Sequence, residues 1–186
     1  MSKIVLDIGS GIPKHKLEGE MLQVANSGYY IAIDCHKGFL PHILADAYNL
    51  PFRSSIADSI ISKAVLEHLT RPQEAVNEIY RVLKPHGYCH VIVPFLHGYH
   101  GNSNFEDYYR FTKQGLKYLF RDFYEVKIEP TGGIIHALSQ LILFGRMPKS
   151  WRKPYLRFIS LFDTNMGYEV ARGWYGVFSK YEKDTT

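Results

Sequence analysis

The sequence predicts a doubly wound α/β domain: a mostly parallel, Rossmann-like, seven-stranded sheet with a helical insertion before the last strand. Three observations support this fold. Short apolar segments recur along the chain, and several end in an aspartate or a glycine, as buried parallel strands do. An amphipathic helix lies between two of them, which implies crossover connections. The 186 residues are 46% hydrophobic and 22% charged, so residues 1–186 can form one domain with a full core.

The predicted strands are short runs of apolar and β-branched residues. Residues 4–8 form the first, and a glycine-rich turn ends it. Residues 29–34 and 43–46 repeat the pattern, each with an aspartate at its end. The remaining predicted strands are residues 60–64, 88–94, 123–128 and 175–181. The proline at the end of the 88–94 segment stops that strand, because proline cannot donate to a ladder.

Two helices are predicted between the later strands. In residues 70–84, apolar side chains recur at the spacing of one helical face. Thr70 and Gln73 fit a capping box at the start of this helix, and a turn through residues 85–87 ends it. A second helix is expected over residues 113–121.

Residues 133–173 form the predicted helical insertion. Two apolar stretches flank a group of basic residues, which are Arg146, Lys149, Arg152, Lys153 and Arg157. The segment could cover an acceptor, form the face of a homodimer, or contact an anionic membrane surface peripherally. Packing as part of the core or as a lid is favoured over membrane contact.

Composition and charge exclude several classes of protein. The net charge is +4 without a dense basic stripe, so no nucleic-acid partner is expected. The N-terminal residues lack the apolar core of a secretion signal, and the longest apolar run is shorter than the roughly 20 residues that span a bilayer. Cys35 and Cys89 form no CxxC motif and are expected to be small buried side chains in a reducing compartment. These features predict a cytoplasmic protein.

The chemistry is expected at the carboxyl ends of the strands, where open α/β sheets bind ligands. Asp7 ends the first strand and is followed by Gly9 and Gly11, which allow a sharp turn and close approach of a ligand. Asp34, at the end of the second strand, could accept hydrogen bonds from a ribose. Asp46, after the third, could accept from an exocyclic amine of adenine. These three features together fit an adenosyl ligand, although each alone is also common in turns and caps.

The motif separates the candidate adenosyl ligands. A dinucleotide fingerprint would require a third glycine where Lys14 stands, and no P-loop sequence is present. A nicotinamide oxidoreductase is therefore disfavoured. An aspartate two residues before the first glycine suits a ligand with positive charge near the turn, as the ammonium and sulfonium of S-adenosylmethionine provide.

A family resemblance is visible in the first half of the chain, in five short stretches that follow the order known from the family. These are residues 5–11, 33–34, 45–52, 66–68 and 78–85. They resemble the class I S-adenosylmethionine-dependent methyltransferases, specifically the type 11 group. A narrower resemblance, over residues 93–95 and 107–112, is to a subgroup often found among cell-surface polysaccharide genes.

The resemblance implies a role for each matching residue. Asp7 and the turn Gly9, Ser10 and Gly11 would line the methionine end of S-adenosyl-L-methionine, Asp34 the ribose, and Asp46 with Ala47 the adenine. Ser62, Lys63 and Ala64 would follow the fourth strand near both the cofactor and the acceptor. The second crossover should be missing or one turn long. The N-terminal helices that lid the cofactor in the family have no counterpart before the first strand, so a partner could supply that lid.

The acceptor side is expected in the segment after the fifth strand. His97 and His100 have intrinsic pKa values suited to a general base. Tyr108, Tyr109 and Arg110 could hold a polar ring or a carboxylate, or could simply pack the loop. His97 and His100 are also spaced as a metal pair, but no third ligand is evident, so no metal site is predicted. His68 is expected to anchor a loop.

The sequence thus predicts a methyltransferase acting on a small-molecule or glycan-like acceptor. The alternative is a non-catalytic S-adenosylmethionine-binding subunit that serves a partner.

Overall fold

The computed structural model describes residues 2–132 and 172–181, together with 148, 150, 151, 154, 155 and 158. Within that part, seven strands form one sheet in the order β3-β2-β1-β4-β5-β7-β6. The strands are β1 (Ile4–Ile8), β2 (Tyr29–Asp34), β3 (Ile43–Leu44), β4 (Ala57–Lys63), β5 (Leu83–Pro94), β6 (Tyr124–Pro130) and β7 (Gly173–Ser179). The first five are parallel, and β7 runs antiparallel to β5 and β6. The predicted fold class is confirmed.

Within residues 2–132, three α-helices cover the sheet: α1 (Gly19–Asn26), α2 (Pro72–Val82) and α3 (Lys113–Leu119). Two single 3-10 turns, η1 (Lys37–Phe39) and η2 (Leu66–His68), follow β2 and β4. The sequence did not predict α1, because this eight-residue helix buries only Met21 and Ala25 and so shows little periodicity. The expected one-turn second crossover corresponds to η1.

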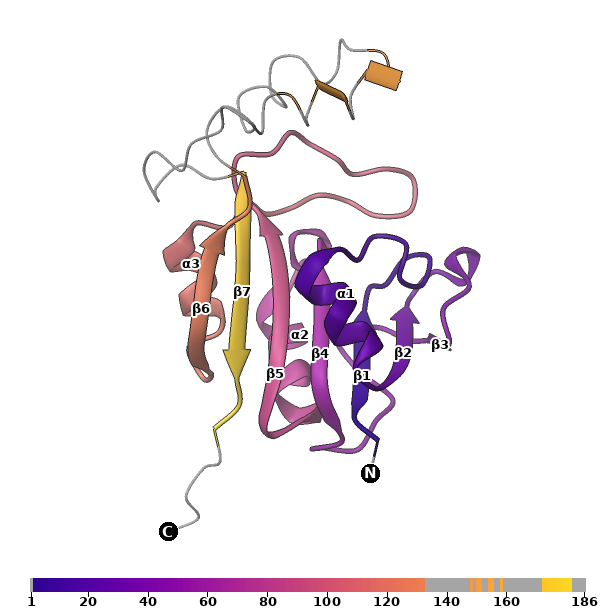
Figure 1. Cartoon of the computed structure of the whole chain (residues 1–186), viewed down its shortest axis with the longest axis vertical. Coiled ribbons are helices and arrows are strands. Elements are labelled where there is room, and N and C mark those ends of the chain that lie inside the picture. Colours follow the sequence, from indigo (N-terminus) through magenta and orange to yellow (C-terminus); the bar gives the residue numbers. More distant parts are fainter. Residues whose placement is uncertain are drawn as a thin grey trace.

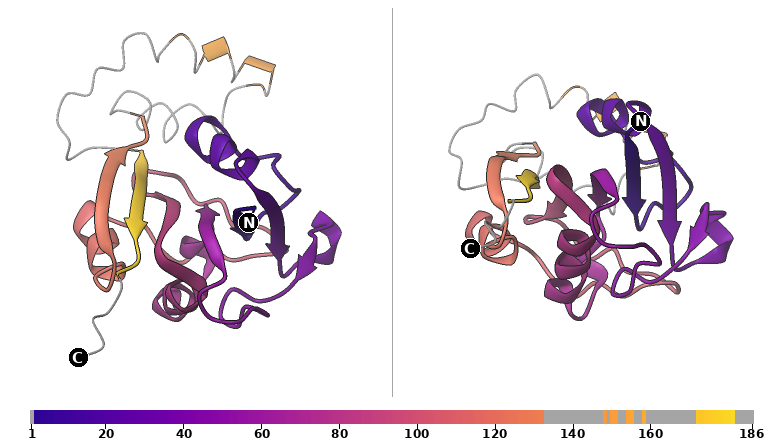
Figure 2. Two further views of the ribbon diagram at one scale, coloured as in Figure 1. Left: turned by 60° about the horizontal axis from the view of Figure 1, so that its bottom comes forward. Right: turned by 90° about the horizontal axis from the view of Figure 1, so that it is seen from below.

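The helices lie on opposite faces of the sheet, α1 on one and α2 with α3 on the other (Figures 1 and 2). On the α1 face, Met21 and Ala25 pack with Val5 and Ile61. The larger core lies on the other face. It includes Ile79 of α2, Leu116 of α3, and residues of β1, β4, β5, β6 and β7. Apolar side chains on both faces explain why the parallel strands read as continuous apolar runs.

The structure changes the predicted boundaries of α2. Its first residue is Pro72, its N-cap is Arg71, and no side chain caps it. The Thr70–Gln73 capping box is therefore wrong. The Thr70 hydroxyl lies 3.3 Å from the Tyr48 hydroxyl, and the Gln73 amide donates to the Leu119 carbonyl oxygen. Both side chains therefore contact residues distant in the sequence, Tyr48 and Leu119, in place of the helix N-terminus.

Two other expectations can be compared with the structure. Cys89 is buried as expected, but Cys35 is exposed, so its burial was wrongly predicted: Cys35 lies just past the end of β2 rather than within it. Most of the predicted insertion over residues 133–173 lies outside the described residues. Among the described residues, no helix has the length and apolar character needed to cross a membrane.

The aromatic packing behind β7 generates a stability prediction. Phe120 and Phe178 are each 1% exposed, and their rings stack at 4.3 Å between centroids. Phe120→Ala should lower the free energy of unfolding by about 3–5 kcal/mol, because it leaves a cavity in the core. Tyr118→Ala, at a side chain 71% exposed, should change it by less than about 1 kcal/mol. Urea denaturation of both variants measures the difference, and equal losses would contradict it.

Candidate functional site

The carboxyl ends of β1 and β2 are joined by one carboxylate. Asp34 accepts hydrogen bonds from the Gly11 amide at 2.8 Å and from the His36 amide at 2.9 Å. Gly9 has φ +62°, and a Cβ there would lie 2.5 Å from Val65 Cγ2. Glycine is therefore required at this position both by backbone conformation and by the space available. The result is a fixed turn with its amides and carbonyls at the edge of the sheet.

Asp7 lies beneath this turn and is fully buried. Its Oδ2 accepts a hydrogen bond from the Tyr30 hydroxyl at 2.6 Å, while Oδ1 has no hydrogen-bond partner among the described residues. Burial raises the pKa of Asp7 from 3.8 to about 6, even though the Tyr30 hydrogen bond and nearby lysines oppose the rise. The edge therefore holds a carboxylate that is costly to ionise without a further positive or hydrogen-bonding group.

Lys16 is a site residue that the sequence reasoning missed. Its ammonium donates to the carbonyl oxygens of Gly9 and Lys63, at the ends of the neighbouring strands β1 and β4. The Lys63 ammonium in turn donates to the Lys16 carbonyl oxygen. Burial lowers the pKa of Lys16. Nothing local marks this lysine, since it follows the glycine turn in an irregular segment, and only the fold brings it between the strands.

A pocket of about 530 Å³ opens at this edge. Among the residues predicted near the cofactor, Gly9, Gly11, Asp34, Asp46 and Ala64 line it. Ser10 is buried behind the turn, where its hydroxyl donates to the Gly11 carbonyl oxygen. Aromatic side chains that the sequence reasoning did not select also line the pocket, and these are His36, Phe39, Tyr48 and Phe105.

The remaining predicted cofactor residues lie around this pocket. Ala47 packs against the main core between two residues that line the pocket. Ser62 is fully buried, and its hydroxyl finds no hydrogen-bond partner in the described part of the chain. Lys63 lines a neighbouring pocket of about 510 Å³. The fold thus brings all the predicted cofactor residues to one edge of the sheet. Some line the two pockets, and others, such as Asp7, Ser10 and Ser62, are buried beneath them.

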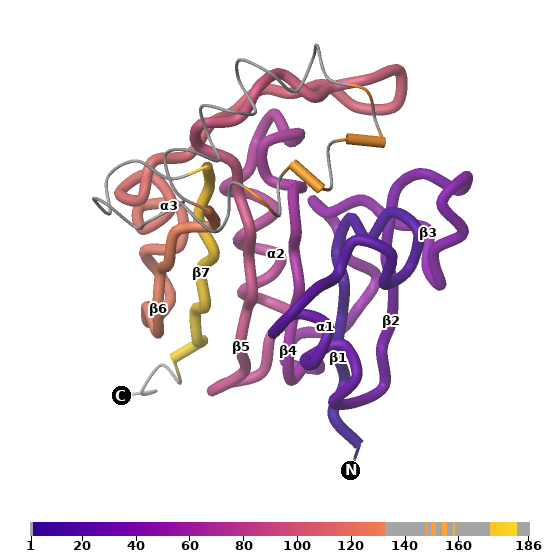
Figure 3. Tube along the Cα trace, turned by 45° about the horizontal axis from the view of Figure 1, so that its top comes forward, coloured from indigo at the N-terminus to yellow at the C-terminus, as the bar shows by residue number. Residues whose placement is uncertain are grey.

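The segment between β5 and α3 arches over this edge of the sheet (Figures 1 and 3). Arg110 fastens it: the guanidinium contacts both carboxylate oxygens of Asp107 at 2.6 Å and donates to the His97 carbonyl oxygen. The same contact holds the pKa of Asp107 well below its usual range. Tyr109 donates to the Thr70 carbonyl oxygen, whereas Tyr108 lines the 530 Å³ pocket.

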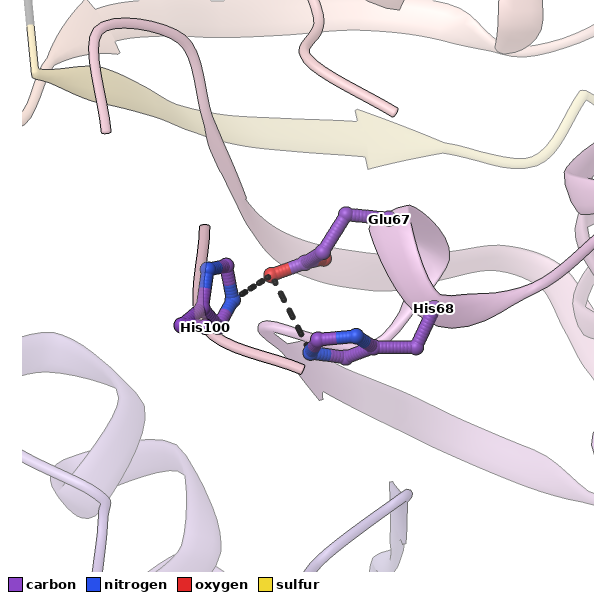
Figure 4. A group of neighbouring side chains, drawn as sticks. All are labelled: Glu67, His68 and His100. Atoms are coloured by element: carbon purple, nitrogen blue, oxygen red, sulfur yellow. Dashed lines mark ion pairs between the residues drawn. The ribbon is translucent and has the colours of Figure 1, made fainter. Parts of the chain in front are cut away.

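Three histidines gather where the segment meets η2. His100 lines both pockets, while His97 lines only the second, and their ring centroids are 4.7 Å apart. Burial lowers the pKa of His97, and the Glu67 carboxylate raises the pKa of His100. His68 Nδ1 lies 2.6 Å from the Glu106 carbonyl oxygen, the loop contact expected for it. Glu67 lies between His68 and His100 (Figure 4).

Residues 6–91 match the family model described as a methyltransferase domain. A tRNA (carboxymethyluridine(34)-5-O)-methyltransferase of Arabidopsis thaliana is 34% identical over 101 residues, which are 48% of this chain and 24% of that protein. The ubiquinone/menaquinone biosynthesis C-methyltransferase UbiE of Ruegeria sp. (strain TM1040) is 46% identical over 48 residues, 26% of this chain and 19% of that protein. The matches therefore span about a quarter or less of each relative's length.

Solved structures share the fold across nearly the whole chain. One is the complex between the Haloferax volcanii Trm112 methyltransferase activator and a putative methyltransferase. It has a TM-score of 0.66 at 16% identity and covers 100% of this chain and 85% of that one. A Methanosarcina mazei S-adenosylmethionine-dependent methyltransferase has a TM-score of 0.62 at 15% identity, covering 98% and 94%. At these identities the similarity shows the fold.

The burial of Asp7 predicts a specific pH dependence of stability. Its folded-state pKa of about 6 lies above the ordinary 3.8, so the folded chain binds more protons between these values. Wild-type stability should fall as the pH rises from about 4 to 6, by about 3 kcal/mol from this group. Asp7→Asn keeps an acceptor for Tyr30 and should lack that decline.

Urea unfolding of both proteins across this pH range measures the effect. The wild type and Asp7→Asn should differ in the slope of stability against pH between 4 and 6, and not above 6. Parallel profiles would show that Asp7 does not titrate in this way.

Proposed function

We propose that this chain is a class I S-adenosylmethionine-dependent methyltransferase of the type 11 family. It binds S-adenosyl-L-methionine and transfers its methyl group to a small-molecule or glycan-like acceptor. The observation that carries this proposal is the 530 Å³ pocket at the carboxyl ends of β1 and β2. Its size suits a nucleoside ligand. Its glycine turn, its two aspartates and its aromatic walls supply the contacts that such a ligand needs.

The adenosine half belongs near Asp34 and Asp46. Asp34 already holds the turn through one backbone bond to each oxygen, and a carboxylate oxygen has capacity for a second donor. The ribose hydroxyls are the donors we assign to it. Asp46 is exposed at the pocket wall beside Tyr48, where it can accept from the adenine amine while the Ala47 amide faces a ring nitrogen.

The methionine half belongs at the ends of β1 and β4. Lys16 shows by its position that the Gly9 and Lys63 carbonyl oxygens suit an ammonium group. The cofactor carries an ammonium and a sulfonium, and the buried Asp7 carboxylate below favours positive charge there. Ser62, whose hydroxyl is unpaired within the described residues, completes this end. Lys16 already takes these two carbonyl oxygens, so a second ammonium group nearby depends on the negative charge of Asp7, Asp34 and Glu67 around it.

The acceptor belongs between η2 and the segment after β5. Methyl transfer is an in-line displacement at a carbon that the sulfonium already activates, so the protein mainly orients the acceptor. Tyr108 and His100 line the pocket and are assigned to acceptor contact and to the removal of its proton. His97, Tyr109 and Arg110 support them, since their contacts hold the loop in place. The homodimer, lid and membrane roles considered for residues 133–173 stay predictions.

Cofactor binding is the direct test of the proposal. Calorimetric titration with S-adenosylmethionine and S-adenosylhomocysteine should give one site per chain. Asp46→Ala should weaken binding by about 10- to 100-fold, the effect of losing one hydrogen bond to a charged group. Asp122→Ala is the matched control, because Asp122 is exposed at the opposite end of the sheet, just before β6.

Two results would argue against the proposal. If neither compound binds and Asp46→Ala behaves like the wild type, the pocket is not a cofactor site. If both compounds bind but no methyl group is transferred to any acceptor of a broad panel, the result would favour the alternative, a non-catalytic S-adenosylmethionine-binding subunit. Activity that appears only when a partner protein is added would strengthen that alternative.

The histidines give a second prediction. Release of S-adenosylhomocysteine should be followed with hydroxyl- and carboxyl-bearing acceptors, including sugars. His100→Ala should lower kcat/KM by about 10²- to 10⁴-fold, because its ring reaches the pocket where the acceptor proton leaves. His97→Ala should cost less than tenfold, since His97 lies behind His100. Equal losses in the two variants would reject this assignment.

A further inference from the structure

Glu67 is a buried charge that the proposed function leaves unexplained. Its side chain is fully buried in η2, and neither carboxylate oxygen has a hydrogen-bond partner among the described residues. Buried carboxylates are normally paired, hydrogen-bonded or bound to a metal, because an isolated one loses its hydration without compensation. An explanation for Glu67 must therefore come from its immediate neighbours.

Two imidazoles point at the same carboxylate oxygen (Figure 4). His100 Nε2 lies 3.4 Å from Glu67 Oε1, and His68 Nε2 lies 3.8 Å from it. Ligand atoms of all three residues lie within 4.8 Å of one another. In a tetrahedral zinc site with bonds of about 2.0–2.1 Å, neighbouring ligand atoms are about 3.4 Å apart. The two nitrogen–oxygen distances, 3.4 and 3.8 Å, are close to that value.

The contacts of each ring on the side away from Glu67 indicate which nitrogen carries the proton. His68 Nδ1 lies 2.6 Å from the Glu106 carbonyl oxygen. His100 Nδ1 lies 3.2 Å from the Gly98 carbonyl oxygen and 3.3 Å from Asp107 Oδ2. These oxygens only accept, so both Nδ1 atoms donate, and it is the Nε2 atom of each ring that faces Glu67 and is available to a metal ion when the ring is neutral. A carbonyl or carboxylate behind the imidazole is the usual outer contact of a metal-binding histidine.

We propose that Glu67, His68 and His100 bind one divalent transition-metal ion, with zinc the preferred probe. Two imidazoles and one carboxylate suit zinc and neighbouring first-row metals rather than magnesium or calcium. Lys16 and Arg110 act on Glu67 only through the electrostatic field, whereas the ion would contact the carboxylate and both Nε2 atoms directly. The sequence predicted no metal site, because no third ligand was evident beside His97 and His100; the fold places Glu67 and His68 beside His100.

Three protein ligands leave a coordination position for water or substrate. His68 and His100 both line the 530 Å³ pocket, so that position faces the region assigned to the acceptor. This step rests on the proposed function and changes one part of it: with Nε2 on the ion and Nδ1 donating to Gly98 or Asp107, His100 acts through the ion and not as the base itself. An acceptor hydroxyl bound to the ion loses its proton to solvent more readily. Its oxygen then forms a bond to the methyl carbon, and the carbon–sulfur bond breaks with its electrons going to sulfur.

The experiment is metal binding by the full chain, without a polyhistidine tag, after treatment with a chelator and its removal. Calorimetric titration should give one zinc per chain, and cobalt substitution should give a visible absorption spectrum with imidazole ligands. Glu67→Gln, His68→Ala and His100→Ala should each weaken zinc binding at least tenfold. His15→Ala, at an exposed histidine, and Cys35→Ser, at the exposed thiol in the pocket wall, should bind like the wild type.

A second measurement covers variants that fold poorly. Zinc should raise the thermal midpoint of the wild type, because a ligand of the folded state stabilises it, and should leave that of Glu67→Gln unchanged. Absence of saturable binding, absence of a thermal shift in the wild type, retention of binding in all three variants, or its loss in Cys35→Ser would each overturn the proposal.

S-adenosylhomocysteine binding is titrated separately, with zinc and with chelator. A chain that binds the nucleoside but no zinc overturns the metal site alone. A chain that binds zinc but no nucleoside overturns the proposed function alone and leaves the metal site in place.

Discussion

The two hydrogen bonds that Asp34 accepts hold the carboxyl edge of the sheet together. They tie the end of β2 to the glycine turn after β1 and to the first residues of the next connection. Together with the Ser10 amide, which donates to the Ile33 carbonyl oxygen, they stabilise the left-handed backbone at Gly9 and Gly11. The register of the parallel strands makes this possible, because Ile8 pairs with Ile33, so that Asp34 lies beside the first residue of the glycine turn.

The same edge concentrates the polar groups that the fold leaves unsatisfied. Among the described residues, the buried side-chain atoms without a hydrogen-bond partner belong to Asp7, Ser62, Glu67 and Trp174. The first three follow or end β1 and β4, beside the two pockets. Such groups destabilise a folded chain, and they collect where a ligand can supply the missing partner. At the opposite edge of the sheet, by contrast, charged side chains are paired, as Lys84 is with Asp58.

Much of the site could be predicted because its residues come directly after recognisable strands. The aspartate at the end of each of the first two strands and the glycines between them needed only the rule that parallel strands end at one edge. Lys16 and Glu67 could not be found in this way. Lys16 reaches the ends of β1 and β4 from an irregular segment. Glu67 becomes significant only because the segment after β5 brings His100 to within 3.4 Å of it.

The sequence by itself determined the strand pattern, the position of the glycine turn and the aspartates at the strand ends, because these depend on local periodicity and on residues near one another in the chain. The tertiary structure decided which charged and polar side chains contact one another. Arg110 was a candidate ligand contact in the sequence, yet in the fold its guanidinium clamps Asp107 and the His97 carbonyl. Glu67 and His100, 33 positions apart in the numbering, meet through long-range packing, which no local pattern records.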